Sequence, residues 1–120
     1  MEGTRAPVGD ESAVRLESHP AVVAEDLPRI YTSIARDDPT AAERVLDAVE
    51  KTFEQLTRQP ECGVTYRTRN RSLPGVRMLP VIGFTRYLVF YRIDVEAVRV
   101  LYLVHGARYL PRLFRREPRG

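Results

Sequence analysis

The residues with the clearest chemistry lie in the second half of the chain. Arg77, His105 and Arg108 form a group that could act on RNA. Metal-free cleavage by 2′-hydroxyl attack needs a base for the proton, cations that stabilise the phosphorane, and a donor to the leaving oxygen. His105 is the member of the group that can act as a base near neutral pH. These three residues are therefore the catalytic candidates if the chain is a nuclease.

Each candidate also has a simpler structural interpretation. His105 can be a strand-end histidine that bonds to the backbone. Arg77 can pair with a helix acid such as Glu50 or Glu54. Arg108 follows a glycine, which loosens the chain and favours exposure. Strand alternation could bring Arg77 and His105 to one concave face of a sheet, which is what joint catalysis would need.

Charge is distributed unevenly along the chain. Residues 1–61 hold 13 of the 16 acids and 7 of the 19 bases, a net charge of −6, whereas residues 62–120 carry +9. This asymmetry predicts a polyanionic target or an acidic partner for the second half, although a basic face that is merely solvated is the alternative. The residues expected to bind a partner are Arg86, Arg92, Tyr109, Arg112, Arg115 and Arg116.

Composition argues against several other classes of protein. A length of 120 residues suits one domain. Cys62 is the only cysteine, so it cannot form an intrachain disulfide, and two histidines are few for a zinc site. No stretch approaches the roughly 20 apolar residues of a membrane span, and residues 1–10 do not resemble a secretory signal. We expect a cytoplasmic protein that needs no metal and no cofactor.

Periodicity predicts a helical hairpin after a short strand. Residues 13–17 alternate as a half-buried strand. A four-three-four spacing of apolar residues then predicts a helix over about 21–36, irregular near Pro28 and with Asp26 as a possible cap. A second helix is expected over about 40–59, capped by Thr40 or by Asp38 ahead of a proline. Its apolar face is formed by Ala42, Val45, Val49, Phe53 and Leu56.

The second half is predicted to form strands. Residues 75–79 read as a strand whose end Pro80 places at an edge or a bulge, and 66–72 as a connection. Residues 87–93 are apolar on both faces, as in a central strand, and 98–104 alternate, with Tyr91 and Tyr102 expected in the core. The order β-α-α-β-β-β predicts an α+β fold, with an antiparallel two-helix hairpin on a mainly antiparallel sheet. We expect a single domain over 13–114, between a flexible extension (1–12) and a basic tail (115–120).

This order of elements coincides with a set of short sequence stretches. They are Ala24–Leu27 and Ile34–Arg36 in the first helix, Pro60–Gly63 after the second helix, and Gly75–Val81, Tyr87–Arg92 and Val104–Arg108 in the strands. Together they resemble the RelE/ParE superfamily of type II toxin–antitoxin toxins over about residues 13–114. The resemblance implies a toxin that a cognate antitoxin keeps silent, and we expect that antitoxin to be acidic and encoded in the same operon.

The resemblance leaves two modes of action open. RelE-like members cleave mRNA in the ribosomal A site, whereas ParE-like members poison DNA gyrase. Many relatives carry an aspartate where this chain has Tyr109, and the lysines with which some members cut mRNA have no counterpart, since Lys51 lies on the second helix. We therefore favour a gyrase inhibitor that acts by binding. An endoribonuclease using Arg77, His105 and Arg108, or a non-toxic binding relative, is the alternative.

Overall fold

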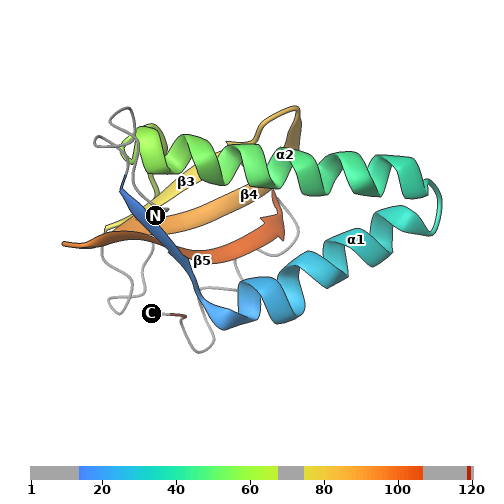
Figure 1. Ribbon diagram of the computed structural model, residues 1–120, viewed down its shortest axis with the longest axis horizontal. Coiled ribbons are helices and arrows are strands. Elements are labelled where there is room, and N and C mark those ends of the chain that lie inside the picture. Colours follow the sequence, from blue (N-terminus) through green and yellow to red (C-terminus); the bar gives the residue numbers. More distant parts are fainter. Residues whose placement is uncertain (1–13, 68–74, 107–118, 120) are drawn as a thin grey trace, which may run out of the picture.

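The computed structural model describes residues 14–67, 75–106 and 119. It confirms the expected α+β fold, with a helical hairpin on a five-stranded mixed sheet of order β1-β5-β4-β3-β2 (Figure 1). No helix in these residues is long and apolar enough to cross a membrane. In chain order the elements are β1 (Arg15–Ser18), η2 (Val22–Asp26), α1 (Leu27–Ala35), α2 (Pro39–Arg58), β2 (Val64–Thr65), β3 (Val76–Val81), β4 (Phe84–Ile93) and β5 (Ala97–His105).

The first helical segment is irregular where Pro28 predicts it. The turn η2 is π-helical, and Pro28 follows in the first turn of α1, where its missing N–H breaks no helical hydrogen bond. Asp26 is not a cap, because its side chain makes no capping bond. Asp38 rather than Thr40 caps α2, since the Asp38 carboxylate accepts a hydrogen bond from the Ala41 N–H at 3.1 Å.

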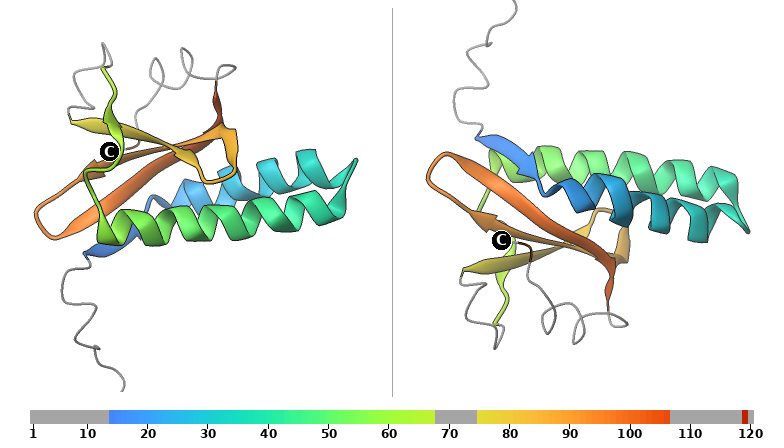
Figure 2. Two further views of the ribbon diagram at one scale, coloured as in Figure 1. Left: turned by 90° about the horizontal axis from the view of Figure 1, so that it is seen from above. Right: turned by 90° about the horizontal axis from the view of Figure 1, so that it is seen from below.

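The sheet is apolar on both faces, and the helices cover one of them. Figure 2 shows α1 and α2 on the same side of the strands. The core on that side joins α2 to β4 and β5 through residues such as Val49, Val89 and Leu103. A second apolar cluster lies on the other face and includes Phe90 and Tyr102. Tyr91 and Tyr102 are both buried, as expected.

The strands differ in detail from those predicted. β1 pairs in parallel with β5, and the other neighbours are antiparallel. Pro80 lies inside β3 rather than at its end, but the register does shift between Pro80 and Val81, as a bulge at a proline predicts. The pairing of β4 with β5 shifts at Leu101 as well. Neither this bulge nor the two-residue strand β2 has a clear signal in the sequence.

Tyr91 closes the connection between α2 and the sheet. Its hydroxyl donates to the Pro60 carbonyl at 2.7 Å and accepts from the Gly63 N–H at 2.9 Å. A Cβ at Gly63 would lie 2.5 Å from this hydroxyl and 2.8 Å from the Met78 carbonyl, so only glycine fits there. Burial raises the pKa of Tyr91, because a phenolate is poorly solvated in this position.

Removing the Tyr91 hydroxyl should destabilise the fold. We expect Tyr91→Phe to lower the free energy of unfolding by about 1–3 kcal/mol, because the Gly63 N–H stays buried without a partner. Urea denaturation at pH 7 measures this. The control is Tyr31→Phe, whose hydroxyl bonds to Glu43 at the surface and whose loss should leave the stability unchanged. Equal stability of the two variants would contradict the role of Tyr91.

The raised pKa of Tyr91 adds a pH dependence. Below the ordinary tyrosine value of about 10, the hydroxyl is protonated in both the folded and the unfolded chain, so it contributes no pH dependence. Above that value the unfolded chain loses the proton first, so stability should fall as the pH rises towards the folded pKa. Tyr91→Phe should lose less stability over this alkaline range than the unmodified chain, in the same urea titrations.

Candidate partner-binding site

The strand β5 loses its neighbour on one side partway along its length. β1 pairs with β5 only from Ala97 to Val100, and the His19 N–H makes a further bond to the Val100 carbonyl at 2.8 Å. Beyond this point the Leu101 carbonyl and the Leu103 N–H bond to side chains instead. Such partners matter, because a buried backbone group without one is costly.

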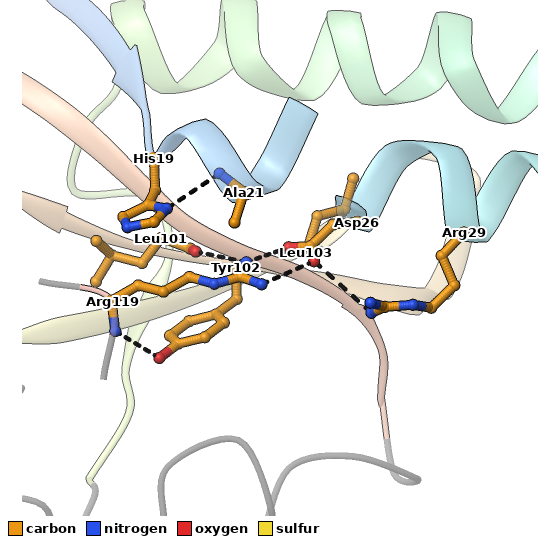
Figure 3. Close-up of polar contacts among 8 residues, drawn as sticks. All are labelled: His19, Ala21, Asp26, Arg29, Leu101, Tyr102, Leu103 and Arg119. Carbon is orange, nitrogen blue, oxygen red and sulfur yellow. Dashed lines mark hydrogen bonds and ion pairs between the residues drawn. The ribbon is translucent and has the colours of Figure 1, made fainter. Parts of the chain in front are cut away.

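Asp26 and Arg119 supply these partners, and they also pair with each other (Figure 3). Asp26 is 1% exposed, and its Oδ2 accepts from the Leu103 N–H at 3.0 Å. Arg119 Nη1 donates to the same oxygen at 2.6 Å, and Arg119 Nη2 donates to Oδ1 at 3.1 Å. Arg119 Nη1 also donates to the Leu101 carbonyl at 3.1 Å. A two-pronged ion pair thus closes the edge of β5 where β1 ends.

Tyr102 completes the surroundings of Arg119. The guanidinium carbon lies 4.7 Å from the centre of the Tyr102 ring. The main-chain N–H of Arg119 donates to the Tyr102 hydroxyl at 2.8 Å, so both the side chain and the backbone of this residue are held. A carboxylate, a carbonyl and an aromatic face together suit a planar guanidinium better than a lysine ammonium.

A pocket of about 90 Å³ lies beside Asp26, between α1 and the end of β5. Arg29, Ser33, Tyr87 and His105 contribute to its lining. Arg29 Nη1 is 3.8 Å from Asp26 Oδ1, and the His105 ring lies edge-on to Tyr87 at 5.3 Å. Nδ1 of His105 is buried and makes no hydrogen bond within the described residues. The pocket therefore offers polar groups next to the Asp26–Arg119 pair.

Arg77 has a structural partner set that the sequence did not predict. Its Nη1 donates to the Gly63 carbonyl at 2.9 Å and to the Glu61 carbonyl at 3.3 Å, and Nη2 is 4.0 Å from the Glu61 carboxylate. Arg77 therefore pairs with the connection after α2, and not with Glu50 or Glu54 on the helix. This places it at the junction that Tyr91 also holds.

The strand register separates Arg77 from His105. Arg77 lies opposite Tyr91 on β4, and His105 lies opposite Tyr87. These partners are four residues apart, which is about 13 Å at roughly 3.3 Å per residue, and β3 and β5 also flank β4 on opposite sides. The two side chains do not converge on one point. Arg108, the third nuclease candidate, lies outside the described residues.

The other predicted binding residues have different surroundings. Arg92 pairs with Asp94 at 3.3 Å. Arg86 is exposed, and within residues 14–67, 75–106 and 119 no acid is within ion-pair distance of it. Tyr109, Arg112, Arg115 and Arg116 lie outside the described residues.

Acids of the first half of the chain neutralise several arginines of the second half. Three pairs cross the two halves: Glu17 with Arg99, Glu61 with Arg77, and Asp26 with Arg119. Part of the charge asymmetry is therefore used within the fold.

Comparison with known proteins agrees with this architecture. A family model described as the ParE toxin of the type II toxin–antitoxin system parDE matches residues 19–109. A solved structure titled as the chromosomal ParDE TA system from P. aeruginosa is similar to the chain with a TM-score of 0.63 and 18% identity, covering 79% of this chain and 98% of that one. No curated protein matches. The family match spans most of the chain, and the chain therefore belongs to the ParE toxin family of type II toxin–antitoxin systems.

Proposed function

We propose that this ParE-family chain inhibits growth by binding DNA gyrase and is neutralised by a cognate antitoxin. The supporting observation is the position of Arg77, which bonds to the Gly63 and Glu61 carbonyls and lies far along the sheet from His105. Cleavage of RNA needs a base and cations within hydrogen-bond reach of one phosphate. Inhibition by binding needs only a complementary surface, which this fold can present without such a group.

His105 keeps the endoribonuclease as a testable second candidate. Its Nδ1 has no hydrogen-bond partner in the described residues, and it borders the pocket that Arg29 also lines. This is the feature that a nuclease could use. Without Arg77, however, such a site lacks one of the three groups on which the nuclease hypothesis depends.

The proposed antitoxin is an acidic polypeptide encoded beside this chain. Arg86 supports an acidic partner, because it is exposed and has no acid beside it in the described part of the chain. The 107–118 stretch adds four more arginines in sequence. Complementary charge raises the rate of association more than the final affinity.

Induction of the chain alone tests the mode of action. We expect filamentation and an SOS response with intact transcripts, and the purified chain should inhibit supercoiling by gyrase. Co-expression with the product of the neighbouring reading frame should restore growth. A rapid stop of protein synthesis with cut transcripts would show a nuclease instead, and normal growth would show a non-toxic relative.

His105→Ala separates binding from cleavage. We expect this variant to keep its toxicity, because gyrase inhibition does not use the imidazole. A nuclease that relied on His105 as its base would lose about 10²- to 10⁴-fold in cleavage rate. Growth after graded induction is the measurement, with the unfolding free energy and the cellular level of the variant measured in parallel. Loss of toxicity in a stable, normally abundant variant would overturn the gyrase proposal.

Arg86→Ala tests the electrostatic contribution to antitoxin binding. The association rate with the product of the neighbouring frame should fall several-fold while the dissociation rate stays nearly constant. The matched control is Arg58→Ala, an exposed arginine on α2. Stopped-flow mixing at low and at physiological salt gives both rates. An association rate that is insensitive to salt would contradict the role of charge.

A further inference from the structure

The site around Asp26 has the features of a binding site for an arginine residue. The Asp26 carboxylate and the Leu101 carbonyl accept three hydrogen bonds from the Arg119 guanidinium, and the Tyr102 ring lies against its face. The Tyr102 hydroxyl also accepts the main-chain N–H of Arg119. Because a backbone group is recognised together with the side chain, the site fits an arginine within a polypeptide rather than a small guanidine compound.

Arg119 can leave this site without breaking the fold. It belongs to no helix or strand, so its departure costs only its own contacts. Asp26 would then keep the Leu103 N–H at 3.0 Å and the neighbouring Arg29 at 3.8 Å. A buried carboxylate that retains a hydrogen bond and a cation is far less costly than an isolated one.

We propose that Asp26, the Leu101 carbonyl and Tyr102 form an arginine-binding site, filled by Arg119 in the isolated chain and by an arginine of the antitoxin in the complex. The assignment of the second occupant rests on the proposed function, whereas the site itself does not. Arg119 and the antitoxin arginine compete for one carboxylate. Departure of Arg119 is therefore a step in assembly of the pair.

The site can be tested without the antitoxin. In Arg119→Ala the site is empty, and N-acetyl-L-arginine methylamide supplies a blocked arginine with both a guanidinium and a backbone N–H. We expect millimolar concentrations of this probe to raise the melting temperature of Arg119→Ala and to shift the NMR signal of the Leu103 amide, which bonds to Asp26. The corresponding lysine derivative should have a much weaker effect.

Two controls show whether the probe binds where we propose. Arg36→Ala removes an exposed arginine in the loop between α1 and α2 and leaves Arg119 in place, so the probe should change neither the melting temperature nor the Leu103 amide. Tyr102→Leu combined with Arg119→Ala removes the ring and should weaken the response to the probe. If the arginine probe leaves Arg119→Ala unchanged, or if the lysine probe acts equally, there is no arginine-binding site.

Antitoxin binding tests the second occupant. The product of the neighbouring frame should bind Arg119→Ala about tenfold more tightly than the unmodified chain, as expected if the site is vacant about a tenth of the time in the latter. Arg36→Ala should bind like the unmodified chain. Equal affinities of Arg119→Ala and the unmodified chain would overturn the exchange while leaving the proposed function intact. Binding to neither would overturn both the exchange and the antitoxin proposal, and the probe would still decide whether the site exists.

Discussion

Beyond Val100, β5 has no strand to accept and donate its outer backbone bonds, and the molecule meets this constraint with one buried carboxylate. Asp26 ends the turn η2, accepts the Leu103 N–H and so fixes the start of α1 to the edge of the sheet. A side chain in this role cannot pair the whole edge as a strand does. It satisfies one donor and brings a negative charge into the interior. That charge then determines what must lie next to it.

The charge at Asp26 explains why an arginine so far along the chain lies within the fold. A buried carboxylate is tolerated when a cation and hydrogen bonds surround it, and Arg119 provides both while it also covers the Leu101 carbonyl. The same logic joins Glu17 to Arg99 and Glu61 to Arg77. The acidic and basic halves of the sequence are therefore complementary within the molecule. An outside partner can compete only for those charges that remain exposed or can be exchanged.

Local patterns were enough to predict the elements, but not the site. The apolar stripe before and after Pro28 predicts an irregular first helix, and Pro80 predicts a bulge, because both effects act within a few residues. Asp26 reads equally well as a helix cap, and its true partners lie 77 and 93 residues away. Strand alternation placed Arg77 and His105 on one face but could not fix their separation along it. That separation depends on the register and bulges of three strands.

The position of Asp26 links partner binding to the stability of the domain. The residue holds η2 on β5, and we propose that it also receives the arginine of the antitoxin, so one carboxylate would serve both roles. In the unfolded chain Asp26, the Leu101 carbonyl and Tyr102 are not held together, and the site does not exist. A ligand that binds only the folded state stabilises it in proportion to its own affinity. An antitoxin bound at this site would therefore preserve the toxin that it silences, and its removal would leave Arg119 to take the place of the lost arginine.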